Sequence, residues 1–118
     1  MTQQAYIRAV RDLYIQLPQT SKRFSRWDRQ FACELYRRQV PFDQVRAAMM
    51  LAVVNRLYRE GPPLPTIRSL HYFRPEIDQA LRQPLPRGYV EYLEYKIADY
   101  PRALAKRASQ THRRLPSA

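Results

Sequence analysis

The residues with the clearest chemistry in this chain are basic and stand close together in the run KRFSRWDR, residues 22–29. Free backbone N–H groups at the start of a helix bind anions, and flanking basic side chains complete such a site. A helix start also disfavours cations, so a bound phosphate would offset their repulsion. We therefore expect a phosphate contact here, with a solvated, salt-screened basic turn as the alternative. The four candidate residues are Lys22, Arg23, Arg26 and Arg29.

Two further basic groups extend this pattern along the chain. Residues 68–74 mix bases with aromatic side chains, which can stack on unpaired nucleic-acid bases while arginine holds phosphates. No acid follows Asp99, and a basic C-terminus of this kind either follows a nucleic-acid backbone or merely solubilises the chain. Together with one base on the outer face of the second expected helix, the additional candidates are Arg37, Arg68, His71, Tyr72, Arg74, Arg102, Lys106, Arg107, Arg113 and Arg114.

The charge of the whole chain agrees with these local patterns. Lys and Arg number 21 against 10 Asp and Glu, which gives a net charge of +11. A field of this sign concentrates polyanions at the surface, so nucleic acid is the first partner to consider. An arginine-rich composition inherited from a GC-rich genome is the alternative explanation.

Residues that would indicate catalysis or metal binding are sparse. The two glycines, Gly61 and Gly88, cannot build a glycine-rich phosphate loop. The single Cys33 is expected as a small core residue, and the two histidines, His71 and His112, stand far apart without clustered ligands. We expect no catalytic residues, no metal and no cofactor.

The stretch from Phe42 to Tyr58 is the element that must position the basic residues. Its centre, residues 47–54, is apolar on every side of a helix, so other helices have to cover it. Amphipathic patterns at residues 3–17, 26–38, 69–81 and 89–109 supply them. We expect an all-α fold, a compact bundle of about five helices around this buried central helix. Such a helix lacks the polar side chains that read base edges, so binding should be largely sequence-independent.

Three local details follow from the same patterns. Ser25 and Asp28 have the spacing of a shortened capping box at the start of the second helix. Trp27 is expected on the inner stripe of that helix, with Phe31 and Leu35. Residues 69–81 are expected to form one continuous helix bent at Pro75, and a helix that starts near Pro75 after one loose turn is the alternative.

The length and apolar pattern predict one helical domain, residues 1–109, followed by a basic flexible tail, residues 110–118. The longest apolar run has eight residues, against ~20 for a membrane span, so no membrane partner is expected. One cysteine and the absence of a secretory leader favour a cytoplasmic location.

The order of elements resembles replication-associated helical modules of bacterial plasmids and phages. The residues are VPFDQV at 40–45, the alanine-rich central helix, and IRSLHYF at 67–73. Over residues 34–81 this order is similar to the C-terminal domain of DnaD-type primosome proteins. Residues 82–84, RQP, stand where that family has a Trp-bearing motif, so helicase contact is not implied. The resemblance implies DNA binding and remodelling without catalysis.

These patterns favour a non-catalytic, largely sequence-independent nucleic-acid-binding accessory protein of a bacterial mobile element, or a subunit of a larger nucleoprotein complex. Such a complex would be replication-associated, or similar to CRISPR effectors with their small helical subunits. The alternative is a protein–protein adaptor whose Arg-rich face meets an acidic partner, with Tyr92 and Tyr95 as its anchor. The choice between DNA and RNA, and between single and double strands, stays open.

Overall fold

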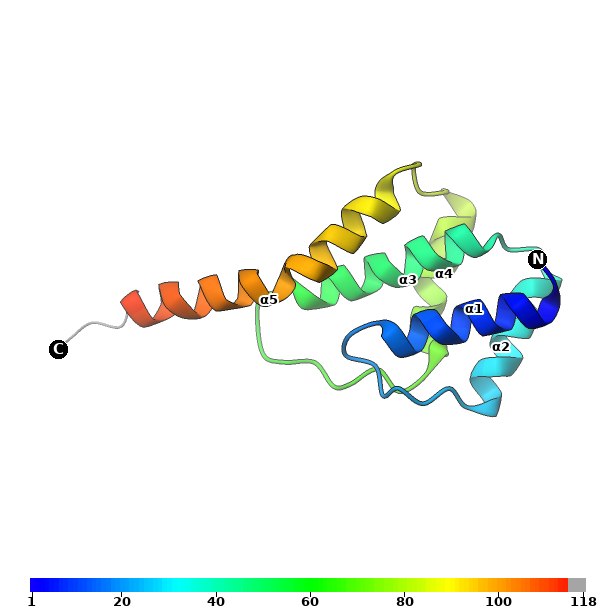
Figure 1. Cartoon of the computed structure of the whole chain (residues 1–118), viewed down its shortest axis with the longest axis horizontal. Helices are drawn as coiled ribbons and strands as arrows, with labels where there is room; N and C mark the ends of the chain where they lie inside the picture. Colours follow the sequence, from blue (N-terminus) through cyan, green and yellow to red (C-terminus); the bar gives the residue numbers. More distant parts are fainter. Residues whose placement is uncertain (115–118) are drawn as a thin grey trace.

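The computed structural model describes residues 1–114, with side chains through Ser109 (Figure 1). Within this part of the chain the fold is all-α, as predicted, and one isolated parallel bridge joins Thr20 to Ile67. The helices are α1 (Gln3–Gln16), α2 (Arg26–Arg37), α3 (Phe42–Leu57), the 3-10 turn η1 (Leu70–Phe73), α4 (Arg74–Arg82) and α5 (Tyr89–Arg114).

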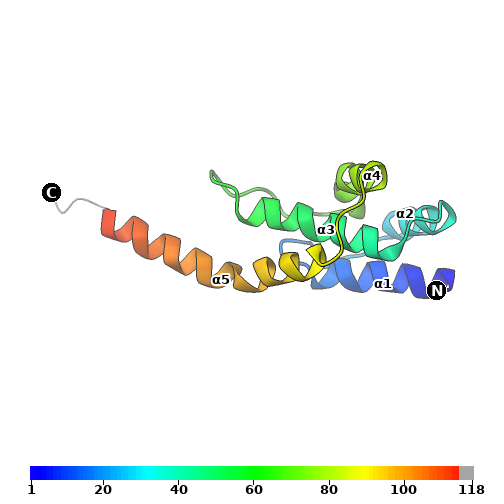
Figure 2. The same cartoon turned by 90° about the horizontal axis from the view of Figure 1, so that it is seen from above.

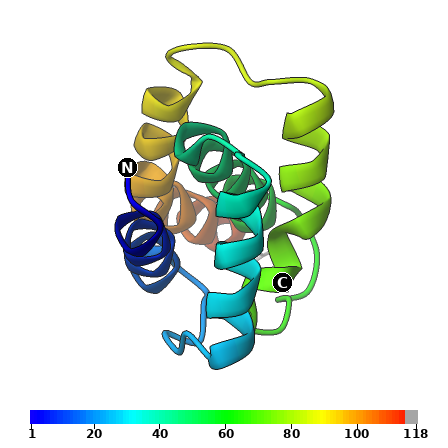
Figure 3. The ribbon, with the colours of Figure 1, turned by 90° about the vertical axis from the view of Figure 1, so that its right-hand side faces the viewer.

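Helix α3 is the buried centre of the bundle, which confirms the prediction for this stretch. Ala48, Met49 and Val53 have no exposed surface. Within the apolar stretch, residues 47–54, every side chain is buried except Leu51, which is partly buried. Seen end-on, α3 lies in the middle with the other four helices around it (Figure 3). An apolar helix in water requires cover of this kind on all sides. Pro41 precedes its first turn, where a missing N–H leaves no hydrogen bond unmade.

The first two helices begin where the sequence indicates, and the predicted capping box is present. The Ser25 side chain accepts from the Asp28 N–H, and the Asp28 carboxylate accepts from the Ser25 N–H. The prediction for Trp27 is wrong, because 62% of this residue is exposed. The inward stripe of α2 instead runs through Asp28, Phe31, Ala32 and Leu35. Asp28 turns inward to its hydrogen-bond donors, and this orientation carries its neighbour Trp27 outward.

The segment around Pro75 does not form the continuous bent helix that we favoured from the sequence. Leu70–Phe73 is a 3-10 turn, and α4 begins at Arg74 with Pro75 in its first turn. A first-turn residue donates no bond within its helix, so proline is accommodated there without a kink. The alternative, a helix that starts near Pro75 after one loose turn, is what the structure shows.

Helix α5 is a single helix with Pro101 inside it. Its first half packs against α3, and its second half projects beyond the bundle (Figures 1 and 2). The Tyr58 hydroxyl donates to the Lys96 carbonyl oxygen (2.7 Å) and fixes the packed half. The helical backbone continues through residue 110, where the predicted tail begins. The side chains of that tail lie outside the described residues, and so do residues 115–118 altogether.

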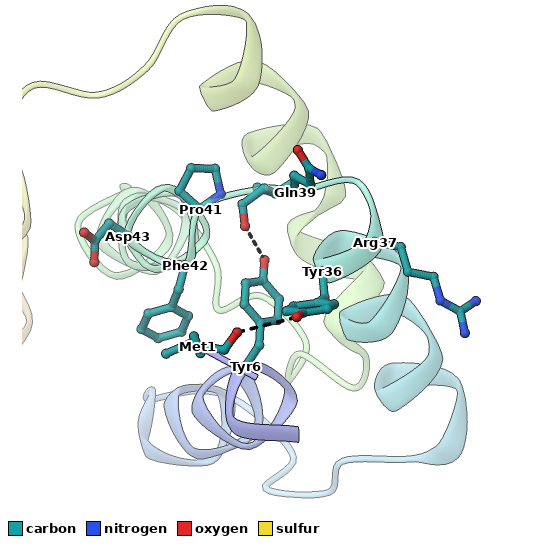
Figure 4. Close-up of a pocket in the computed structure, with 9 residues that line it drawn as sticks. Met1, Tyr6, Tyr36, Arg37, Gln39, Pro41, Phe42 and Asp43 are labelled. Atoms are coloured by element: carbon teal, nitrogen blue, oxygen red, sulfur yellow. Dashed lines mark hydrogen bonds between the residues drawn. The ribbon is translucent and has the colours of Figure 1, made fainter. Parts of the chain in front are cut away.

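A cavity of about 580 Å³ lies where the start of α1 meets the α2–α3 turn (Figure 4). The Tyr6 hydroxyl donates to the Val40 carbonyl oxygen (2.8 Å), and its ring meets Tyr36 and Phe42 edge-on. Burial raises the pKa of Tyr6 from 10.0 to about 12. Through its hydrogen bond and its ring contacts, this tyrosine holds the α2–α3 turn against α1.

The raised pKa of Tyr6 predicts a loss of stability in alkali. Above pH 10 the unfolded chain gives up this proton while the folded protein keeps it, so the free energy of unfolding should fall as the pH rises from 10 toward 12. The loss between about pH 9 and about pH 11, measured by urea unfolding, should be smaller in Tyr6→Phe than in the parent. Equal losses in both proteins would contradict this assignment.

The two halves of α5 should differ in their contribution to stability. Leu93→Ala, at a position with no exposed surface, should lower the free energy of unfolding by about 3 kcal/mol through lost contacts and a cavity. Leu104→Ala, in the projecting half and 49% exposed, should cost less than about 0.5 kcal/mol. Urea unfolding monitored by circular dichroism measures both, and similar losses would show that the projecting half also packs on the bundle.

Candidate nucleic-acid interface

Two loops distant in sequence run side by side and bring basic residues together. We call residues 18–25 and 59–69 the paired loops; they meet along the lower edge of Figure 1. The Ser21 N–H donates to the Ile67 carbonyl oxygen, and the Ile67 N–H donates to that of Gln19, both at 2.8 Å. This ladder places Arg68 in the loop that lies beside Lys22 and Arg23.

The carboxylate of Asp28 joins α2 to the second loop. Asp28 is 1% exposed; its Oδ2 accepts from the Ser25 N–H (2.9 Å). Its Oδ1 accepts from the Ser69 hydroxyl (3.0 Å) and the Leu70 N–H (2.9 Å). One side chain therefore caps α2 and η1 together, and it brings the basic groups of residues 22–29 and 68–74 to neighbouring positions.

This arrangement changes the physical reason for a phosphate at the start of α2. The Asp28 carboxylate already supplies the negative charge that the helix dipole favours, and the capping box uses the N–H of Asp28. A bound anion is therefore not needed to stabilise this helix start. Any phosphate contact depends instead on the surrounding side chains.

Those side chains are exposed and stand apart from acids. Among the described residues, ion pairs form at Arg11–Asp12, Arg46–Glu94 and Arg74–Glu34. The stretches 13–27 and 61–75 contain no acid at all. Lys22 differs from its neighbours because its Nζ donates to the Leu17 carbonyl oxygen (2.6 Å) at the end of α1. The exposed arginines of this region, for which the described residues provide no carboxylate partner, are Arg23, Arg26, Arg29 and Arg68.

The aromatic-basic group separates into two environments. The His71 ring is stacked on the buried Phe31 ring, with centroids 4.7 Å apart and planes at 13°. The Arg74 guanidinium lies 4.4 Å from the same Phe31 ring and pairs with Glu34 at 3.8 Å. Tyr72 faces elsewhere, since its hydroxyl accepts from Arg56 and its ring lies under that guanidinium. His71 and Arg74 therefore border α2, whereas Tyr72 belongs to a structural contact.

Arg56 is a residue whose importance the sequence analysis missed. It is buried in the last turn of α3, where the helix dipole favours a cation. Its Nε donates to the Gln19 side-chain oxygen (2.7 Å), and one terminal nitrogen donates to the Pro65 carbonyl oxygen. It thereby ties both paired loops to α3. The available signal was an arginine in the last turn of this otherwise apolar helix, one turn after Ala52.

The remaining candidates lie outside this surface. Arg37 is at the opposite end of α2 and borders the cavity of Figure 4. Arg102 and Lys106 are exposed on the projecting half of α5, at the far end of the molecule from α2 (Figure 1). Arg107 donates to the Tyr58 carbonyl oxygen (3.3 Å) at the end of α3. The side chains of the last two candidates, Arg113 and Arg114, lie outside the described residues.

Comparisons with known proteins assign this chain to no family. No protein-family model matches the chain, and neither a curated protein nor a solved structure does. In the described part of the chain no three His, Cys, Asp or Glu side chains are grouped as metal ligands. No helix of that part combines the length and apolarity needed to cross a membrane.

The Asp28 carboxylate should be the main stabilising contact of this region. Asp28→Ala removes three accepted hydrogen bonds and leaves the buried Leu70 N–H unpaired, so it should lower the free energy of unfolding by about 3 kcal/mol. Asp12→Ala, which removes one exposed ion pair, is the control and should cost less than about 0.5 kcal/mol. Urea unfolding gives both values, and hydrogen exchange of the Leu70 amide should accelerate only in the Asp28 variant.

Proposed function

We propose that this chain is a non-catalytic, largely sequence-independent nucleic-acid-binding accessory protein. The observation that supports this proposal is the group of exposed arginines on α2 and the paired loops. Acid-free stretches, 13–27 and 61–75, contain three of them, and the carboxylate of Asp28, next to the fourth in the sequence, is buried and occupied by hydrogen-bond donors. Guanidinium groups that have no carboxylate partner among the described residues are suited to bidentate contact with phosphate oxygens. These residues are Arg23, Arg26, Arg29 and Arg68.

The architecture favours backbone contact over the reading of base sequence. Helix α3, which follows the α2 turn, is buried over most of its length and cannot enter a major groove. The exposed bases sit instead on loops and on the first turns of α2. Arg102 and Lys106, four residues apart on the projecting half of α5, offer a second place where a phosphate backbone would be held.

Within this proposal the chain serves a larger assembly. The resemblance of residues 34–81 to DnaD-type C-terminal domains favours a replication-associated role in a bacterial mobile element. The size, charge and helicity suit a subunit of a ribonucleoprotein complex equally well. The cytoplasm is the compartment that fits either role.

A protein–protein adaptor is the second candidate, and the exposed aromatic residues of α5 favour it. Tyr92 and Tyr95 lie three residues apart on α5, and more than half of each is exposed. Exposed tyrosines of this kind anchor protein interfaces. In this case an acidic protein would bind the exposed arginines of α2 and the paired loops, and the affinity for nucleic acid would be low.

The salt dependence of binding tests the proposed function. The affinity for a single-stranded oligonucleotide should fall linearly with salt on a log–log plot, with a slope of about −0.7 for each phosphate neutralised. Replacing Arg23, Arg26 and Arg29 by Gln should reduce that slope by about 2. The control replaces Arg8, Arg82 and Arg87 by Gln, which removes the same charge from exposed positions elsewhere.

Fluorescence anisotropy of a labelled oligonucleotide measures these slopes. The control variant should keep a slope close to that of the parent. Equal slopes in the two triple variants would show that net charge alone drives binding. Undetectable binding at low salt, together with co-purification of one acidic protein, would favour the adaptor.

A further inference from the structure

The only tryptophan of the chain is on the surface, beside the arginines of the proposed interface. Trp27 lies in the first turn of α2 and is 62% exposed. A large aromatic ring that is exposed to water contributes little of the stability that its burial would provide. Its position is imposed by Asp28, which is held inward by its three hydrogen bonds. Trp27 is therefore fixed outward by the packing of its neighbour.

One basic side chain lies against this ring. The Arg26 guanidinium lies 5.4 Å from the Trp27 ring centroid. Phe31 lies one helical turn further on, on the buried stripe of α2, and carries the His71 ring on it and Arg74 beside it. The exposed indole is thus one helical turn from Phe31, on which the exposed His71 imidazole is stacked, and Arg26 and Arg74 are the neighbouring cations.

We propose that Trp27 stacks on an unpaired base of a single-stranded nucleic acid, and that this interface therefore prefers single strands to duplexes. The inference rests on the proposed function and names its substrate class. A base stacks on a flat aromatic ring whatever its identity, whereas the bases of a duplex are stacked on each other and unavailable. The neighbouring arginines hold the flanking phosphates. The His71 ring, which its stack on Phe31 holds in place, offers a position for a second base.

Trp27 is also its own reporter, because its emission is the only tryptophan signal of the protein. The full chain is titrated with an oligo-dT strand of about 12 nucleotides, an abasic strand of the same length, and a duplex. Anisotropy of a labelled strand measures occupancy independently. We expect dT to quench Trp27 emission and to bind more tightly than both other ligands at equal salt.

Trp27→Ala should weaken dT binding by about tenfold, within the range for loss of one stacked base, and should leave the salt slope unchanged. Tyr95→Ala removes an equally exposed aromatic, 62%, from α5 and should leave dT binding as it was. Because Trp27 is exposed, its replacement should not unfold the protein, and circular dichroism verifies this.

The outcomes separate the inference from the function on which it rests. If dT, abasic strand and duplex bind equally and the Trp27 emission does not change, the stacking inference is wrong while nucleic-acid binding stands. An unchanged dT affinity in Trp27→Ala would also overturn it. If none of the three ligands binds at low salt, the proposed function itself fails.

Discussion

The buried carboxylate of Asp28 is the interaction on which the arrangement of the surface depends. It accepts hydrogen bonds from the start of α2 and from the start of η1, two segments about 40 residues apart. A charged acceptor in a buried site is stable only when donors satisfy it, and these donors fix its position. The same contact sets the rotation of α2. That rotation decides which of its side chains face water.

A second buried ionic side chain, Arg56, also holds the paired loops. Arg56 reaches from the end of α3 to Gln19 and Pro65, one residue in each paired loop. The loops contain little regular structure, and their mutual ladder is limited to the contacts around Ile67. One buried anion and one buried cation, each bonded mainly to neutral groups, hold these loops, and the Tyr14 hydroxyl and the Thr20 side chain add hydrogen bonds between the loops and α1. Among the described residues no ion pair involves a basic side chain of these loops, so their positive charge is not neutralised.

The division of α5 into a packed and a projecting half has a different origin. Up to about Tyr100 the helix follows α3, and its apolar stripe is covered. Beyond Pro101, within the described side chains, the stripe is exposed at Leu104, and Arg102 and Lys106 are presented at a distance from the paired loops. The molecule thus presents two basic regions at separate places, and under the proposed function a strand of nucleic acid long enough to reach both would be bound at more than one point.

The sequence by itself determined the helical fold, the buried centre and most helix limits. Apolar periodicity and the Ser25 cap are local features, and they specify a helix without knowledge of its neighbours. It also determined the excess of positive charge. Only the tertiary structure decided that residues 22–29 and 68–74 adjoin, that Trp27 faces outward, and that Arg56 is buried. Each depends on a hydrogen bond between residues more than fifteen positions apart, and sequence spacing carries no record of such partners.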